Sequence, residues 1–321
     1  MNRFFRKFAL SSLAVCAFAA GAVGAASADA AYPKITVIFQ TEEGFPFFNP
    51  IKKGAEEAAS ALRATVNFEY GNGNPDRIKS LFQTALAAKP DGVALTIIDS
   101  EAYNKDICAL VKAGIPVIAY NVDSVHGPEV SCRMAFIGQD FVAGGYLIGK
   151  RMVQTAGIGK GDLIFTPVDS PDAVYAQLRQ KGVDQAMKEV GATTEILGTG
   201  FNESGILGAQ KEYLIGHPNV KAIIGIGQPQ VEMAIKAVQD NKRRIAIGGF
   251  DLSPAIMDGI KSGAVTATVD QQPYTQGFYS VAQLVHYIRY GLYPSSMKTG
   301  NDGLVDATNY QNAQRELGLR R

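Results

Sequence analysis

The sequence from Asp76 to Ile98 reads DRIKSLFQTALAAKPDGVALTII and contains two hydrophobic patterns in succession. Over residues 76–88 apolar side chains recur every three or four positions, which predicts a helix with one buried face. Pro90 ends the helix, because proline disfavours a helical conformation in the residue before it. Over residues 93–98 nearly every side chain is apolar, as is typical of a strand buried on both faces of a parallel sheet. The stretch therefore predicts a helix packed on a parallel strand.

The same alternation continues along the chain from residue 35 onward. Short apolar runs alternate with longer amphipathic stretches, which predicts an α/β fold of doubly wound parallel sheets with helices on both faces. The predicted strands are residues 35–39, 66–70, 93–98, 116–120, 163–166, 194–197, 222–226, 245–249 and 265–269. A helix is expected at 275–290. Gly114, Gly191 and Gly263 each follow a helical run, where a left-handed residue commonly ends a helix.

The predicted elements also repeat at long range. Residues 35–37 match 163–165 at an offset of 128, and the turn at 71–74 matches 198–201 at an offset of 127. Two further matches, of a proline turn and of a strand end, lie at offsets of 128 and 129. A nearly constant offset over four strand–helix units predicts two similar lobes. This is an inference about structure and carries no statement about function.

The charges of the chain are nearly balanced. Lys and Arg number 31 against 30 Asp and Glu, which gives a formal net charge of +1. Such a balance leaves no excess of positive charge with which the protein could bind nucleic acid. Beyond the N-terminal region, Gly, Pro or a charge breaks every apolar run within about ten residues, so no membrane-spanning helix is expected.

Residues 1–30 differ from the rest of the chain. Three basic residues precede an apolar run, and small residues follow at 26–30, which is the pattern of a cleaved secretory signal peptide. The mature protein is therefore expected to be exported to an oxidising compartment. In that oxidising compartment Cys108 and Cys132 either form a disulfide or remain two buried thiols, and the sequence leaves both alternatives open.

The loops that follow the predicted strands are the candidate site, because ligands of such sheets bind beyond the carboxyl ends of the strands. These loops carry aromatic, amide and carboxylate side chains: Phe47, Phe48, Asn121, Asp123, Phe201, Gln228 and Asp251. Aromatic rings can stack on C–H faces, while amides and carboxylates form hydrogen bonds with hydroxyls. The combination suits a polyhydroxylated ligand better than a phosphate.

The sequence lacks the motifs of common catalytic and cofactor sites. No G-x-S-x-G element marks a hydrolase nucleophile, and none of the three His lies at metal-ligand spacing from another His or a Cys. The Gly-rich residues 157–161 precede a strand instead of following one, which argues against a phosphate-binding loop. We therefore predict no enzymatic activity, no metal site and no cofactor.

Six stretches carry a family pattern: FPFF at 45–48, KGAEEAA at 53–59, AGIPVI at 113–118, GQD at 138–140, GGFD at 248–251 and VTATVDQQP at 265–273. In this order they resemble the periplasmic sugar-binding proteins of the ribose- and galactose-binding type, the type I periplasmic binding proteins. The resemblance implies a monomeric, non-catalytic receptor whose two lobes close on a small ligand. It also implies delivery of that ligand to an ABC transporter permease, and a chemoreceptor is a second partner to consider.

The resemblance assigns roles to single residues. Phe47 and Phe48 are implied as stacking walls, and Phe201 contributes from the opposite lobe. Asn121 and Asp251 occupy positions of hydroxyl-binding acids. Gln271 is a further site residue, on the segment where the chain recrosses between the lobes.

Departures from the ribose-type pattern affect the expected ligand. Val122 and Gln177 stand where ribose-type members carry Arg. Gln228, beside Gly227, takes the place of a usual Asn, and Asp123 is expected to compensate from a shifted position. A site with acids and no convincing Arg predicts a neutral sugar or polyol and not an anionic sugar acid.

The resemblance further implies discontinuous lobes, because the chain crosses between them three times. We expect an N-terminal lobe of residues 31–138 plus 271–300 and a C-terminal lobe of residues 139–270 plus 301–321. Two other functions remain to be tested: a glycoside-acting enzyme that uses Asp123 and Asp251 as paired carboxylates, and the ligand-sensing domain of a regulator.

Overall fold

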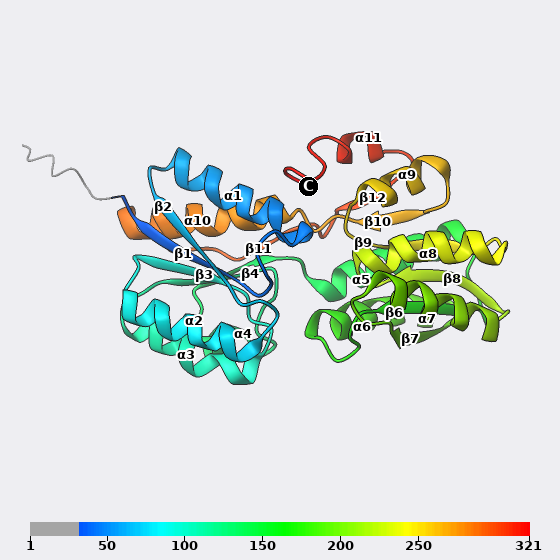
Figure 1. Cartoon of the computed structure of the whole chain (residues 1–321), viewed down its shortest axis with the longest axis horizontal. Helices are drawn as coiled ribbons and strands as arrows, with labels where there is room; N and C mark the ends of the chain where they lie inside the picture. Colours follow the sequence, from blue (N-terminus) through cyan, green and yellow to red (C-terminus); the bar gives the residue numbers. More distant parts are fainter. Residues whose placement is uncertain (1–31) are drawn as a thin grey trace, which may run out of the picture. The chain divides into compact units, whose positions relative to one another are not determined.

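The computed structural model describes residues 32–321, and the predicted signal peptide at 1–30 lies outside the described residues. Two six-stranded sheets form, and helices cover both (Figure 1). We call each sheet with its covering helices a lobe. Within residues 32–321, no helix combines the length and the apolar character that crossing a membrane requires.

The first sheet has the strand order β11-β5-β4-β3-β1-β2, and all its neighbouring strands are parallel. Its strands are β1 (Lys34–Phe39), β2 (Thr65–Tyr70), β3 (Gly92–Leu95), β4 (Val117–Tyr120), β5 (Ala135–Gly138) and β11 (Met297–Lys298). The helices of this lobe are η1 (Pro46–Phe48), α1 (Asn49–Ala61), α2 (Pro75–Ala88), α3 (Ser100–Lys112), α4 (Gly127–Ser131) and α10 (Pro273–Tyr290). Helices α1 and α10 share one hydrophobic cluster with the sheet, and α2 and α3 share another.

The second sheet has the order β12-β10-β9-β8-β6-β7, in which only β12 is antiparallel to its neighbour. Its strands are β6 (Leu163–Val168), β7 (Thr193–Gly198), β8 (Val220–Gly225), β9 (Ala246–Phe250), β10 (Ala267–Val269) and β12 (Leu304–Asp306). The helices of this lobe are α5 (Phe141–Ala156), α6 (Val174–Lys188), α7 (Glu203–Gly216), α8 (Gln228–Asn241), α9 (Pro254–Ser262) and α11 (Tyr310–Ala313).

The two strand orders confirm the predicted repeat. The series β5-β4-β3-β1-β2 in one sheet corresponds to β10-β9-β8-β6-β7 in the other, so both lobes are doubly wound α/β units. Each strand predicted from the sequence is present within three residues of its expected bounds. The prediction missed β5, β11 and β12, which have four residues or fewer and give little periodicity to recognise.

The chain passes between the two sheets at three crossings. The first crossing follows β5, the second lies between β10 and α10, and the third lies between β11 and β12. Backbone hydrogen bonds join the crossings: the Thr299 N–H donates to the Gly138 carbonyl (2.9 Å), and the Asp270 N–H donates to the Gly303 carbonyl (2.8 Å). Gly300 has φ +67°, and a Cβ there would lie 2.3 Å from the Asp270 carbonyl oxygen, so this contact requires glycine.

Glycine also sets the spacing of the helix pair α5 and α6. A Cβ on Gly145 would lie 2.1 Å from the Arg179 carbonyl oxygen, and a Cβ on Gly182 would lie 2.1 Å from the Val142 carbonyl oxygen. Reciprocal glycines therefore allow the two backbones to touch. Since Arg179 lies on α6, this contact also fixes the position of the Arg179 backbone relative to α5.

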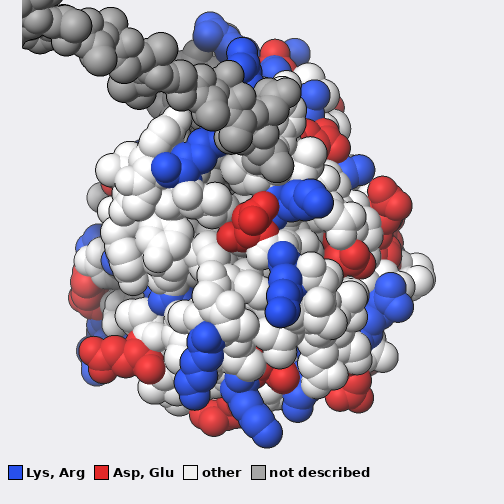
Figure 2. Space-filling model, turned by 90° about the vertical axis from the view of Figure 1, so that its left-hand side faces the viewer, with Lys and Arg blue, Asp and Glu red and all other residues white. Residues whose placement is uncertain are grey.

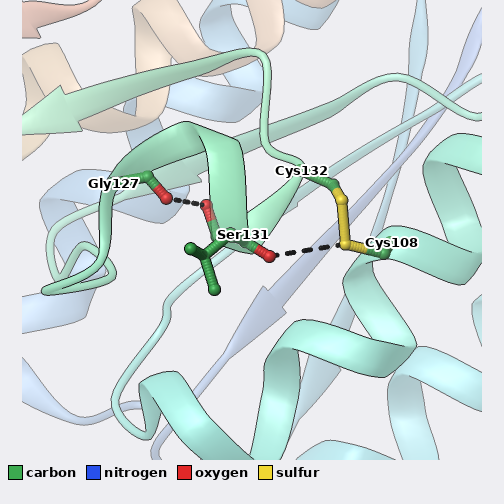
Figure 3. Close-up of a disulfide and its surroundings, with 5 residues drawn as sticks. Cys108, Gly127, Ser131 and Cys132 are labelled. Carbon is green, nitrogen blue, oxygen red and sulfur yellow. Dashed lines mark hydrogen bonds between the residues drawn. A yellow bond between two sulfur atoms is a disulfide. The ribbon is translucent and has the colours of Figure 1, made fainter.

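Cys108 of α3 and Cys132, which follows α4, form a disulfide with their Cα atoms 5.0 Å apart (Figure 3). Of the two alternatives that the sequence left open, the structure has the disulfide. The Ser131 hydroxyl donates to the Gly127 carbonyl (2.8 Å) and closes the single turn of α4. The disulfide links the segment after β4 to α3, a long helix of the same lobe.

The glycine contact between α5 and α6 gives a stability prediction. Gly182→Ala should lower the free energy of unfolding by about 1–3 kcal/mol, because the added methyl group overlaps a backbone carbonyl that has little room to move. Gly208→Ala in α7 is the matched control. A Cβ at Gly208 meets nothing within 4 Å, so this variant should be about 0.4–1 kcal/mol more stable. Denaturant unfolding measures both, and equal effects would contradict the close approach.

Candidate functional site

The strands β4 and β9 end in the same unusual backbone conformation. Asn121 follows β4 with φ +61°, and Asp251 follows β9 with φ +70°. Asn and Asp tolerate this left-handed region better than most residues, although it still costs energy. The Asn121 N–H donates to the Ile137 carbonyl (3.1 Å) in the neighbouring strand, and the Asp251 N–H donates to Val269 (2.9 Å) in the same way. The two lobes therefore present one polar side chain each from equivalent places.

The side chain of Gln271, on the second crossing, joins these two residues. Its Nε2 donates to Oδ1 of Asp251 (2.6 Å), and its Oε1 accepts from Nδ2 of Asn121 (3.5 Å). The Asn121 amide also donates to Oε1 of Gln276 at the start of α10 (3.2 Å). All four residues are buried, so a chain of buried hydrogen bonds connects the strand ends of the two lobes.

Arg179 of α6 extends this polar chain. Its guanidinium carbon lies 4.0 Å above the Phe250 ring centroid, and its Nη1 donates to the Ile226 carbonyl (2.7 Å). Nη1 is also 4.0 Å from Oδ2 of Asp251, and Nη2 donates to Oε1 of Gln139 on the first crossing (3.5 Å). Only 2% of Arg179 is exposed. Its Nε has no hydrogen-bond partner among residues 32–321.

Burial dominates the titration of the site acid. It raises the pKa of Asp251 above the ordinary value, while the charge of Arg179 and the hydrogen bond from Gln271 act in the opposite direction. Burial also raises the pKa of Asp270 on the second crossing. Both carboxyl groups are therefore costly to ionise in this part of the protein, and a partner for either one lowers that cost.

A cavity of about 110 Å³ adjoins this network. Three residues predicted from the sequence line it: Phe47, Gln228 and Asp251. Its other lining residues are Pro46, Pro50, Leu252, Ser253, Pro254, Asp270, Pro273, Leu317, Gly318 and Arg321. The cavity thus combines an aromatic residue of the first lobe with the strand-end acid of the second. Among residues 32–321, no three His, Cys, Asp or Glu side chains are grouped to hold a metal ion.

Two of the predicted aromatic residues lie outside this cavity. Phe48 is 6% exposed and packs against the rings of Phe39, Phe45 and Phe47 in the core of the first lobe. In this structure Phe48 supports Phe47 from the core, and its role as a wall of the site stays a prediction. Phe201 is 79% exposed and lines a separate hollow on the second lobe.

Two predicted polar residues also lie outside this cavity. Gln177 lines a different hollow, formed by α6 and β7, and does not reach Asp251. Asp123 forms an ion pair through both carboxylate oxygens with Arg133 and lines another pocket. A satisfied Asp123 does not replace a missing group in the cavity.

The sequence analysis missed Arg179, whose Nη1 lies 4.0 Å from Oδ2 of Asp251. The buried face of α6 contains Ala176, Arg179, Gly182, Val183 and Ala186. An Arg in the middle of an otherwise small and apolar helix face is an available signal, because such a charge requires a partner. The expected Arg position fell on Gln177, which lies two residues away and on another face of the helix.

A family profile described as "Periplasmic binding protein domain" matches residues 35–291, which is most of the chain. The chain belongs to this family. The match runs from β1 to α10 and includes the first two crossings and every strand-end residue described above, and it ends before β11 and β12. Membership places the chain among binding proteins, as the resemblance implied.

Relatives of the chain agree with this membership. It is 30% identical over 284 residues to the xylose/arabinose-binding protein XylF of Sulfolobus acidocaldarius, covering 82% of this chain and 68% of the relative. It is 25% identical over 232 residues to the ribose import binding protein RbsB of Salmonella typhimurium, covering 71% and 76%. Among solved structures, a carbohydrate transporter from Acidothermus cellulolyticus 11B in complex with myo-inositol is 28% identical, with a TM-score of 0.79. That match covers 88% of this chain and 96% of the other.

The raised pKa of Asp251 gives a prediction for the ligand-free protein. An acid whose pKa is higher in the folded state stabilises that state at low pH, and this contribution disappears as the pH rises through the raised pKa. The free energy of unfolding of the parent minus that of Asp251→Asn should therefore increase as the pH falls from 7 to 4. Urea unfolding at several pH values measures the difference. A difference that decreases with falling pH would show that the charge of Arg179 outweighs burial.

Proposed function

We propose that this chain is a periplasmic receptor that binds a neutral sugar or polyol between its lobes and delivers it to an ABC transporter permease. The observation that supports this most directly is the buried chain Asn121–Gln271–Asp251, which joins both lobes beside a cavity lined by Phe47. Such a chain offers donors and acceptors in the mixture that hydroxyl groups require. The family and the relatives named above support the same role.

The charges beside the cavity favour a neutral ligand. Arg179 already faces Asp251, the Ile226 carbonyl and the Phe250 ring, so its positive charge is balanced within the protein. A sugar acid or phosphate would have to compete with Asp251 for that charge. A ligand hydroxyl can donate a hydrogen bond to the Asp251 carboxylate, which lines the cavity, without adding charge.

The proposal also includes closure of the lobes, their boundaries, the oligomeric state and the protein partners. The three crossings are short, so rotation about them would let the lobes close on a ligand, with Phe201 as a wall contributed by the second lobe. We place the lobe boundaries at 31–138 plus 271–300 and at 139–270 plus 301–321. We further propose a monomer, with the permease as its partner and a chemoreceptor as a second one.

The structure supports binding over glycoside hydrolysis. The two acids of the hydrolase hypothesis, Asp123 and Asp251, line different pockets, and Arg133 neutralises Asp123. They are therefore not arranged as a catalytic pair across one bond. A nucleic-acid partner is also disfavoured: on the face drawn in Figure 2, Lys and Arg are interspersed with Asp, Glu and uncharged residues.

A thermal-shift screen tests the proposed function. The mature protein is heated with xylose, arabinose, ribose, myo-inositol and, as an anionic comparison, galacturonate. A neutral ligand at 100 times its dissociation constant should stabilise the folded state by about 2.7 kcal/mol, which produces a clear shift in melting temperature. Galacturonate should produce none, and each stabilising sugar should be recovered unchanged. Stabilisation by galacturonate alone, or conversion of a sugar, would contradict the proposal.

Substitution at the strand end tests the site itself. Asp251→Asn should weaken binding of the stabilising sugar by roughly tenfold to a few hundredfold, since it removes charge-assisted hydrogen bonds worth about 1.5–3 kcal/mol. Gln177→Ala is the matched control from the neighbouring helix and should bind as the parent does. Calorimetric titration at pH 7 compares the three proteins. Loss of affinity in Gln177→Ala alone would contradict a site at Asp251 and would indicate that Gln177 binds the ligand, as expected from the sequence.

A further inference from the structure

The residues after α11, 314–321, begin on the second lobe. Tyr310 and Ala313 of α11, together with Leu317, pack on the hydrophobic cluster that contains Ile256 and Met257 of α9. Figure 1 shows α11 in red near α9, with the chain after it running away from α9 to the end marked C. This end of the segment is therefore held to the second lobe by apolar contacts.

The other end of the segment contacts the first lobe. The Arg320 guanidinium donates to both carboxylate oxygens of Glu57 on α1, at 2.7 Å and 3.3 Å. Tyr274 of α10 donates its hydroxyl to the same carboxylate (2.6 Å). These hydrogen bonds lower the pKa of Glu57 to about 2, so the carboxylate is charged at neutral pH. Arg320, near the end of the segment, thus binds a carboxylate that already joins α1 to α10.

Between these two attachments the segment lies against the ligand cavity. Leu317, Gly318 and Arg321 line the cavity together with Phe47 and Asp251. Arg321 donates to Oδ2 of Asp270 on the second crossing (2.8 Å), and that carboxylate is 3% exposed. Glu316 and Gly318 both have positive φ, at +59° and +76°, which turns the chain so that the two arginines can diverge.

We propose that residues 314–321 form a strap that supplies a third wall of the binding site and slows release of the bound sugar. The inference rests on the proposed function and adds a part of the chain that neither lobe's strand-end loops include. The strap is attached to one lobe by packing and to the other by the Glu57–Arg320 ion pair. A ligand that leaves the cavity past this wall must displace it, so weaker attachment shortens the lifetime of the complex.

Charge reversal across the ion pair tests the strap. Arg320→Glu and Glu57→Arg each place like charges together, while the double variant restores an opposite pair with its ends exchanged. The probe is whichever of xylose, arabinose, ribose and myo-inositol binds the parent most tightly, and stopped-flow tyrosine fluorescence measures its dissociation rate. Each single reversal should raise this rate by about two- to fivefold, in the range expected for an ion pair near the surface. The double variant should release the probe more slowly than either single variant, although residue 320 still faces Glu316 and residue 57 still faces Lys53 as like charges.

Lys211→Glu is the matched control, because it reverses one charge of an exposed pair with Asp240 on α7 and α8, away from the cavity lining. It should release the probe at the parental rate, and deletion of residues 314–321 should raise the rate at least as much as Arg320→Glu does. If the parent binds a probe and the single reversals release it at the parental rate, the strap is overturned while the proposed function stands. A double variant that stays as fast as the singles also overturns it. A parent that binds none of the four probes contradicts the proposed function and the strap together.

Discussion

The side chain of Gln271 is the contact on which the rest of the site depends. Each sheet ends a central strand with one polar residue in a left-handed conformation, and these two residues belong to different lobes. A side chain on a crossing can reach both. Gln271 does so by donating to Asp251 and accepting from Asn121, which an amide can do because it carries a donor and an acceptor on one planar group. The site therefore exists only where the chain passes between the lobes.

The same contact explains why a charged pair is tolerated in this place. Burial of Asp251 and Arg179 is unfavourable, and their attraction at 4.0 Å recovers only part of the lost hydration. Hydrogen bonds from Gln271 to the acid, and from Arg179 to the Ile226 and Gln139 oxygens, give both groups further polar partners. Networks of this kind are stabilising only when nearly every member has a partner. A ligand hydroxyl is a suitable partner for the groups that the protein leaves incompletely bonded.

The periodicity of the sequence was sufficient to predict the architecture, and the predicted repeat reappears as matching strand orders. Strands buried on both faces produce continuous apolar runs, whereas β11, with two residues, produces no pattern. The position of Asp251 was predictable because it directly follows a strand. Arg179 was not found, since its role depends on how closely α5 and α6 approach through Gly145 and Gly182. The strap could not be predicted from the sequence, because Glu57 and Arg320 are far apart along the chain and only the folded structure brings them into contact.

The most direct test is a crystal structure of the protein with the sugar or polyol that stabilises it most in the thermal-shift screen. The account predicts electron density for the ligand between the lobes, with hydroxyl oxygens within hydrogen-bond distance of both Asn121 and Asp251. The ring of Phe47 should lie against the ligand. A ligand bound instead in the hollow beside Gln177, or one that contacts only a single lobe, would contradict the central role of the Asn121–Gln271–Asp251 chain.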